Sequence, residues 1–423
     1  MTKYRWRIVA LLFFATSINY IDRQVIGLLK PTLEQEFGWS ETDYSRIVLA
    51  FSAAYALGLL LFGRFIDLVG VRRGYAISIV AWSVAAMAHA FAASTAGFAA
   101  IRAALGLGEA GNFPAAIKTV AEWFPKKERA FATGLFNSGA NIGAVLAPVA
   151  VPWILGVWGW KEAFVITGAL GFIWLFFWLR MYRAPLDHPH VNDAERAHIL
   201  SDHDETPSAE KPPQWAELFR FRQTWAFVVG KLLTDPIWWF FLFWLPSYFA
   251  STFQLDLKKP SWALAIVYSA TTVGSIGGGY LSGWLIARGA PVFRARKTAM
   301  LIFALCVAPI MAARFCVEMW QAIALISLAA AAHQAWSANI FTTVSDMFPK
   351  RAVSSVTGIG GMAGSVGGIL FPMLVGYLLD LYKASGNITA GYNVLFVICG
   401  LAYLLAWALM HILAPRMERI TLD

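Results

Sequence analysis

Residues 99 to 114 read AAIRAALGLGEAGNFP, an apolar stretch that carries both an arginine and a glutamate. Arg102 and Glu109 are seven residues apart, so in a helix they lie on nearly the same face with a rise of roughly 10 Å between them. Each charge costs about 2.5 to 3.5 kcal/mol at the centre of a membrane helix, and Ala and Gly offset little of that. The stretch therefore predicts a membrane helix whose charged face points at a ligand or proton site. The alternative is a buried ion pair that only holds helices together.

Apolar runs of similar length recur along the chain. Its 423 residues are 58% hydrophobic and 14% charged, and the mean hydropathy is +0.58. Runs of about 20 apolar residues between charges or Gly and Pro are typical of transmembrane helices. We expect an all-α polytopic membrane protein whose twelve transmembrane helices cover roughly 8–29, 45–66, 75–93, 97–117, 131–153, 160–180, 224–250, 261–286, 298–316, 319–346, 352–380 and 391–413.

The net charge of +9 is a topology signal. Most of the basic residues fall on one side of the predicted membrane segments, and the positive-inside rule then puts both termini in the cytoplasm. We therefore expect an integral protein of a bacterial inner membrane, monomeric and surrounded by lipid, with no nucleic-acid partner. Its three cysteines lie in apolar segments without CxxC spacing, which argues against a disulfide framework or a metal site.

The chain divides into two similar halves. Residues 181–222 are polar and proline-rich, and we interpret them as a cytoplasmic linker with a short helix near Ala194 to Leu200, between six-helix bundles at 1–180 and 223–423. A shift of 224 residues aligns FPK at 124–126 with FPK at 348–350, and TG at 133–134 with TG at 357–358. Such a repeat predicts two bundles related by an axis along the membrane normal, with a site between them near the midplane.

Several motifs resemble one transporter family. Together with the two repeats, Gly63, Asp67, Gly70, Arg72 and Arg73 resemble the major facilitator superfamily and its signature loop; Gly283 replaces the acidic residue in the second half. NYIDRQVIG (19–27) and RAALGLGEAGNFPA (102–115) are similar to the anion:cation symporter family, which transports sugar acids and other organic anions. The stretches at 230–249 and 333–350 resemble its hexuronate branch. The glycine runs lie inside apolar helices, so no ATP-binding loop and no cofactor besides a coupling proton are expected.

Two adjacent charges, Asp22 and Arg23, lie in the middle of the first helix and point about 100° apart. We expect one of them to meet the fourth helix. A guanidinium suits a carboxylate substrate because it stays charged and presents a fork of donors, whereas a carboxylate can gain or lose its charge. We predict that Arg102 binds the substrate carboxylate, with Arg23 as the second candidate, and that Asp22 and Glu109 carry protons. The resemblance implies the same roles.

Polar and aromatic residues predict contacts to sugar hydroxyls. In the first half these are Tyr20, Tyr55, Asn112 and Asn141, and in the second half they are Trp238, Trp239, Gln334, Trp336, Ser337 and Asn339. The alternative for each aromatic residue is an anchor at the membrane interface.

Three further groups have more than one interpretation. Asp67, Arg72 and Arg73 lie at a cytoplasmic helix junction and are expected to control opening. Lys231 and Asp235, spaced i,i+4, predict either a local ion pair or a role in gating or in a second substrate contact. His333 is equivalent to Glu109 in the repeat, so it is either a second titrating group or a hydrogen-bonded structural residue.

These patterns predict a proton-coupled symporter that imports a hexuronate such as galacturonate or glucuronate by alternating access. Another organic anion, namely an aldonate, a glucarate-like diacid or an aromatic acid, is the alternative substrate. More remote alternatives are a polytopic membrane enzyme or a sensor. An enzyme needs a nucleophile with its base, or clustered metal ligands, at one membrane depth, and the sequence predicts neither.

Overall fold

The computed structural model describes residues 2–201, 212–255 and 262–422, and all the regular secondary structure in this part of the chain is helical. The first half contains α1 (Tyr4–Phe37), α2 (Glu41–Val69), α3 (Val71–Ala88), α4 (Thr95–Glu109), α5 (Asn112–Trp123), α6 (Lys126–Val157) and α7 (Trp160–Met181). The second half contains α10 (Arg222–Phe253), α11 (Trp262–Ala287), α12 (Val292–Val307), α13 (Met319–Met347), α14 (Val353–Ala384) and α15 (Ile388–Leu413). Between them lie α8 (Asp193–Leu200) and α9 (Trp215–Leu218).

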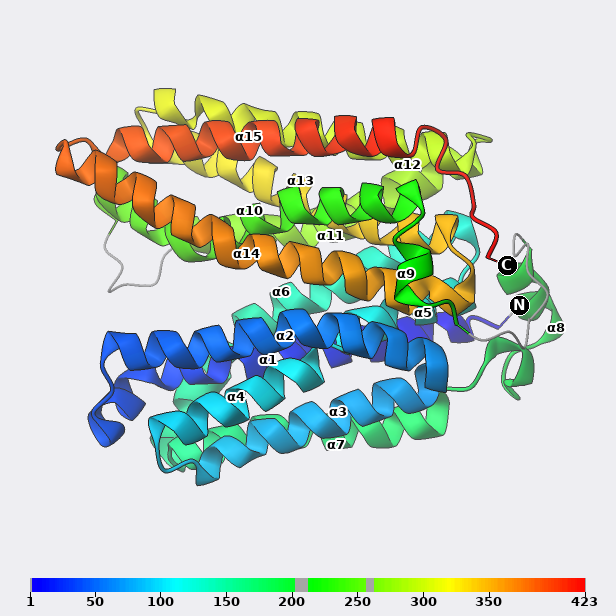
Figure 1. Cartoon of the computed structure of the whole chain (residues 1–423), viewed down its shortest axis with the longest axis horizontal. Coiled ribbons are helices and arrows are strands. Elements are labelled where there is room, and N and C mark those ends of the chain that lie inside the picture. The colour runs from blue at the N-terminus through cyan, green and yellow to red at the C-terminus, as the bar shows by residue number, and fades with distance from the viewer. Residues whose placement is uncertain (1, 202–211, 256–261, 423) are drawn as a thin grey trace.

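The helices form two groups that lie side by side. In Figure 1, α1–α4 and α7 fill the lower half of the view, and α10 and α12–α15 fill the upper half. Across the two groups, α2 packs against α14 and α6 packs against α11. Both termini lie at one end of the molecule together with α8, at the right of Figure 1. We call this the terminus-bearing end.

The expected helix at 97–117 is in fact two helices. It breaks at Ala110 and Gly111, directly after Glu109. Pro114 has no N–H to donate to the carbonyl of Ala110, four residues earlier, so the helical hydrogen bonds cannot continue through this point. Gly111 also approaches α3 closely, because a Cβ there would lie 2.3 Å from Ser78 Oγ. The proline instead fits the first turn of α5, and Glu109 ends α4.

Eight of the described helices are long and apolar enough to cross a membrane: α2, α3, α6, α7, α10, α12, α14 and α15. The other four expected spans are α1, α4 with α5, α11 and α13. Polar or charged residues lower the mean hydropathy of α1, α11 and α13, as Asp22 and Arg23 do in α1. The fourth span is divided by the helix break, so that α4 and α5 are each short. The all-helical polytopic fold is confirmed.

Glycines bring the two halves into backbone contact towards the terminus-bearing end. A Cβ on Gly63 of α2 would lie 2.5 Å from the carbonyl oxygen of Ser354 at the start of α14. On the other side, a Cβ on Gly279 of α11 would lie 2.1 Å from the carbonyl oxygen of Ala130 in α6. Any larger side chain would push the helices apart at these places, so the contact requires glycine.

The linker docks on the first helix of the chain. The helix expected near residues 194–200 is α8, and its Glu195 is fully buried. Glu195 Oε2 accepts a hydrogen bond from the Tyr4 amide at 3.0 Å, and Oε1 accepts bonds from the Arg5 amide and the Arg5 Nη1 at 3.1 Å each. Burial of the carboxyl raises its pKa, but hydrogen bonds from Thr2, Tyr4 and Arg5 outweigh this and lower the pKa of Glu195. The carboxylate thereby caps the N-terminus of α1.

Candidate functional site

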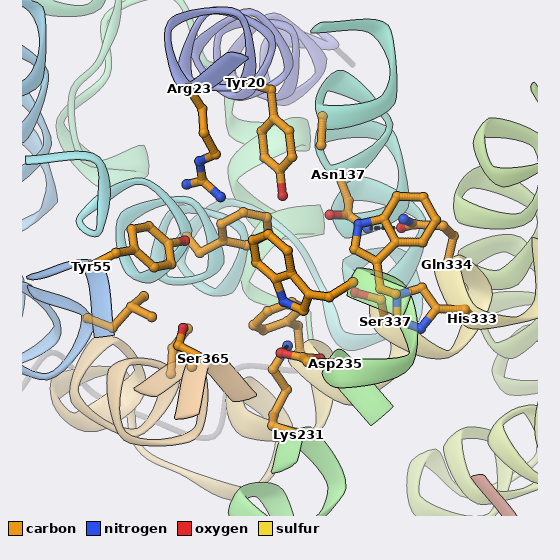
Figure 2. Close-up of a pocket in the computed structure, with 18 residues that line it drawn as sticks. Tyr20, Arg23, Tyr55, Asn137, Lys231, Asp235, His333, Gln334, Ser337 and Ser365 are labelled. Carbon is orange, nitrogen blue, oxygen red and sulfur yellow. Dashed lines mark hydrogen bonds and ion pairs between the residues drawn. The ribbon is translucent and has the colours of Figure 1, made fainter. Parts of the chain in front are cut away.

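A pocket lies between the two halves (Figure 2). Its walls come from α1, α2, α5 and α6 in the first half and from α10, α13 and α14 in the second. The lining residues are Tyr20, Arg23, Tyr55, Leu59, Phe113, Asn137, Ala140, Lys231, Asp235, Trp238, Trp239, His333, Gln334, Ser337, Phe341, Thr357, Gly361 and Ser365. The pocket therefore combines charged groups, amides, hydroxyls and aromatic rings.

Arg23 of α1 is the guanidinium of this pocket. Its Nε donates to Glu109 Oε2 at 2.9 Å, so α1 meets the fourth helix as predicted. The guanidinium lies over the rings of Tyr55 and Tyr20, at 4.5 and 4.9 Å from their centroids. In Figure 2 the group points towards the centre of the pocket from the upper left. Its Nη2 is buried and has no hydrogen-bond partner among the described residues, so the guanidinium has donor capacity that these residues leave unused.

Arg102 lies outside the pocket, contrary to expectation. It is almost fully buried, and its Nη2 donates to the main-chain oxygen of Arg23 at 2.5 Å. Arg102 lies two helical turns before Glu109 on α4, so its side chain is displaced along the helix axis from that of Glu109. There it contacts the backbone of α1. Of the two arginines considered as carboxylate partners, only Arg23 lines the pocket.

Glu109 and Asp22 are buried behind the pocket wall. Glu109 is fully buried at the end of α4, and its Oε1 has no hydrogen-bond partner among the described residues. Asp22 lies beside Thr167 and Arg102 inside the first half. Glu109 is thus paired with Arg23 and also interacts electrostatically with Arg102, whereas Asp22 interacts with both Glu109 and Arg102, and both carboxylates are shielded from water.

The second half contributes its own ion pair. Lys231 Nζ lies 2.7 Å from Asp235 Oδ2 and 3.9 Å from the centroid of the Phe341 ring. The i,i+4 pair expected from the sequence is present, and both of its members line the pocket. His333 also lines the pocket, where its ring stacks on Trp238 with an interplanar angle of 1°, and its Nδ1 is hydrogen-bonded to the Tyr403 hydroxyl.

One hydrogen bond in the pocket joins the two halves. Asn137 Nδ2 of α6 donates to Gln334 Oε1 of α13 at 2.9 Å. Sequence reasoning selected Gln334 but missed Asn137. The signal was available, because Asn137 precedes the selected Asn141 by four residues and lies on the same face of the helix. Thr357 and Ser365 of α14 were also missed, since they lie among the glycines of a small-residue run.

Four expected contact residues lie away from the pocket lining, although Tyr20, Tyr55, Trp238, Trp239, Gln334 and Ser337 belong to it. Asn112 donates to Thr16 Oγ1 at 3.3 Å and accepts from Tyr75. Asn339 donates to the carbonyls of Gly278 and Ala335 at 2.9 Å each, and Trp336 packs edge-on against Tyr403. The fourth residue, Asn141, is buried in α6. A buried polar group needs partners. Asn112 and the Nδ2 of Asn339 find theirs within their own half, whereas Asn339 Oδ1 has none among the described residues.

The expected gating residues separate into two kinds. Asp67 of α2 accepts from Lys118 Nζ at 2.6 Å and from the amides of Ser355 and Ser354 at 2.6 and 3.3 Å. Since these two serines open α14, Asp67 bonds the N-terminus of a helix in the other half. Arg72 instead donates to Leu179 of α7, within the first half, and Arg73 is exposed.

The second half has a charge contact without an acidic residue at position 283. Arg296 of α12 pairs with Asp346 of α13 at 2.9 Å, and its Nη2 donates to the Lys126 carbonyl of the first half at 2.7 Å. Gly283 is itself close to the first half, since a Cβ there would lie 2.5 Å from the Lys127 carbonyl oxygen. Backbone proximity thus replaces the side chain found at the equivalent position of the first half.

Two helical bundles with a charged, polar pocket between them define a secondary transporter. Residues 12–372 match the Major Facilitator Superfamily. The chain is 34% identical over 418 residues to the hexuronate transporter of Escherichia coli K12, covering 96% of this chain and 94% of that protein. It is 30% identical over 389 residues to the D-galactonate transporter of Escherichia coli O6:H1, covering 89% and 90%.

A solved structure of a proton:xylose symporter bound to 6-bromo-6-deoxy-D-glucose has the same fold. Its TM-score is 0.75 at 15% identity, and the match covers 98% of this chain and 97% of that one. The chain belongs to the major facilitator superfamily. It is therefore an integral membrane transporter and not an enzyme.

Proposed function

We propose that this protein is a proton-coupled symporter that imports a sugar-acid anion, specifically a hexuronate such as galacturonate or glucuronate. The observation that carries the proposal is the pairing of Arg23, which lines the pocket, with the fully buried Glu109 behind it. The names of the two relatives, a hexuronate and a D-galactonate transporter, support a sugar acid as the substrate class.

Arg23 is the proposed partner of the substrate carboxylate. Its Nε is occupied by Glu109, while Nη2 has no partner among the residues described. A guanidinium that is held in place by a carboxylate on one side and by tyrosine rings on its faces loses little freedom when an anion binds. The hydrogen bond between Asn137 Nδ2 and Gln334 Oε1 leaves the other amide atoms of this pair, together with the Ser337 hydroxyl, for the sugar hydroxyls.

Proton coupling follows from the charge balance around Arg23. One guanidinium neutralises Glu109 in the empty pocket, and a substrate carboxylate adds a second negative charge next to it. In a buried site, two anions and one cation are unfavourable, so binding of the anion favours uptake of a proton by Glu109. We assign the second proton-carrying role to Asp22, whose neighbour is Arg102.

Alternating access is proposed to occur by rocking of the bundles at 1–180 and 223–423, joined by the linker at 181–222. Asp67 and the glycine contacts between α2 and α14 support a gate at the terminus-bearing end. The distribution of basic residues supports a cytoplasmic location for that end, in a bacterial inner membrane. A monomer is sufficient for this mechanism, because both walls of the pocket come from one chain.

The test is uptake of labelled galacturonate into vesicles that contain the purified protein, with and without an inward proton gradient. We expect the wild type to accumulate galacturonate only with the gradient. Glu109→Gln should lose accumulation but keep exchange of labelled for unlabelled galacturonate, because exchange needs no net release of a proton.

Two results would contradict the proposal. If the wild type takes up no galacturonate under any gradient, the hexuronate assignment fails, and the same assay with an aldonate, glucarate and aromatic acids would identify the anion. If uptake ignores the gradient and Glu109→Gln behaves like the wild type, then Glu109 only holds Arg23 in place.

A further inference from the structure

The most open carboxylate of the described pocket is Asp235 of α10. Its side chain is 23% exposed, compared with 0% for Glu109, 4% for Lys231 and 12% for Arg23. In Figure 2, Asp235 lies below the centre of the pocket, on the side opposite Tyr20 and Arg23, with other lining side chains drawn between them. The pocket thus has a guanidinium on one side and a carboxylate on the other.

Asp235 has acceptor capacity left for a ligand. Its Oδ2 is 2.7 Å from Lys231 Nζ, and one ammonium uses only one of the roughly four acceptor positions of a carboxylate. The side chain is also held in place from behind. A Cβ on Gly364 of α14 would lie 2.2 Å from Asp235 Oδ2, so α14 passes directly against the carboxylate. The group is thus fixed and accessible at the same time.

The surroundings of Asp235 suit the neutral end of a sugar. Trp238, three residues later on α10, stacks on His333 and offers an aromatic face to the C–H groups of a sugar ring. Ionised carboxylates accept from hydroxyl groups more strongly than neutral acceptors do. A second carboxylate on the ligand would instead meet the negative charge of Asp235, because Lys231 is already neutralised by it.

We infer that Asp235 determines which sugar acids enter this pocket: it accepts hydrogen bonds from the hydroxyls remote from the bound carboxylate, and it excludes sugar dicarboxylates. This inference rests on the proposed function, since it needs a sugar acid bound at Arg23. Its chemical content is a site for monocarboxylates that carry hydroxyls at their far end. Lys231 has the supporting role of holding the carboxylate in place.

The experiment compares binding of galacturonate and of glucarate, a dicarboxylate, to the purified full-length protein in detergent by isothermal titration calorimetry. We expect the wild type to bind galacturonate and to bind glucarate at least tenfold more weakly. Asp235→Asn should weaken galacturonate binding by about tenfold, the usual cost of losing a charge-assisted hydrogen bond. The same variant should bind glucarate more tightly, because Lys231 is left without its counter-ion. Asp380→Asn, at an exposed carboxylate of α14, is the matched control and should behave like the wild type.

Asp235→Glu keeps the charge and is the second variant, in case the amide variant does not fold. It should still reject glucarate, whatever it does to the affinity for galacturonate. The inference is overturned if a folded Asp235→Asn keeps the wild-type preference for galacturonate over glucarate, or if Asp235→Glu accepts glucarate. Either result leaves galacturonate binding by the wild type intact. If the wild type binds neither acid, the proposed function fails first and the inference fails with it.

Discussion

The guanidinium groups of Arg23 and Arg102 have different surroundings. Arg23 faces the pocket, whereas Arg102 is hydrogen-bonded to the backbone of α1. We expect Arg23→Lys to raise the Kd for galacturonate at least about tenfold, since an ammonium cannot bind Glu109 and a substrate carboxylate with one planar fork. Arg102→Lys should change the Kd by less than about threefold, although it alters the environment of Asp22. Both values come from titration calorimetry, and equal losses in the two variants would contradict the placement of Arg102 outside the site.

For individual residues, the sequence indicates which ionisable side chains lie in the membrane segments but not which way they point. A charge in an apolar run is conspicuous, so Asp22, Arg23, Arg102 and Glu109 were all selected. Which face of a helix meets a cavity depends on how the helices pack, and hydropathy carries no information on that. Arg102 was therefore preferred over Arg23, and Asn141 was selected while Asn137, on the same face, was missed.

Among the individual elements, α8 is held to the start of α1 by one carboxylate. We expect Glu195→Gln to weaken this docking by about 1 to 3 kcal/mol, because the bonds to the amides of Tyr4 and Arg5 lose their ionised acceptor. The measurement is hydrogen exchange of residues 193–200 at neutral pH, which should become faster in the variant. Asp193→Asn, at the fully exposed side chain of Asp193 on the same helix, should leave the exchange unchanged.

The same contact should depend on pH. The pKa of Glu195 is lower in the folded protein than its usual value of 4.5, so its contribution to stability is present above that value and is lost as the pH falls through the lowered pKa. At pH 7 the docking is complete, and faster exchange should appear in the wild type only under strongly acidic conditions. Exchange in Glu195→Gln that still responds to acid as the wild type does would assign the docking to other groups.

The existence of the helices was easier to predict than their interruptions. Long apolar runs indicated the spans, and the polar linker indicated α8. The break between α4 and α5 was missed because a run of Ala and Gly is equally compatible with one helix or two. Pro114 is the signal in the sequence that indicates the break. The close approach of Gly111 to Ser78 depends on the neighbouring helix and could not be predicted from the sequence.

For the whole molecule, we expect the contact of Asp67 with α14 to stabilise closure at the terminus-bearing end, together with other contacts between the halves such as Arg296 with the Lys126 carbonyl. Asp67→Asn weakens a charge-assisted bond to the amides of Ser354 and Ser355, worth about 1.5 to 3 kcal/mol, and should shift the balance of open and closed states roughly ten- to hundredfold towards opening at the terminus-bearing end. Spin labels at the C-terminal end of α2 and the N-terminal end of α14 measure this opening as a longer distance between the labels. Arg72→Gln is the control, because the side-chain hydrogen bond of Arg72, to the Leu179 carbonyl, lies within the first half. An unchanged distance in Asp67→Asn would remove the gating role from this residue.

The internal repeat predicted the two-bundle arrangement, which the structure has. It could not predict that the halves meet closely towards the terminus-bearing end, because a sequence that supports two facing states favours neither by its pattern alone. The two facing states differ in a few contacts between the halves, such as that between Gly63 and Ser354.

The balance of cations and carboxylates in and behind the pocket has an electrical consequence. Arg23 is paired with Glu109 and Lys231 with Asp235, and behind the pocket wall Arg102 and Asp22 add one charge of each sign, so in their ordinary ionised forms these six groups sum to zero. A carrier that returns empty therefore moves no net charge through the membrane field, and the voltage neither helps nor hinders that half of the cycle. If one proton accompanies each monoanion, the loaded carrier also moves no net charge. Each additional proton makes the inward step a current that a negative cell interior accelerates.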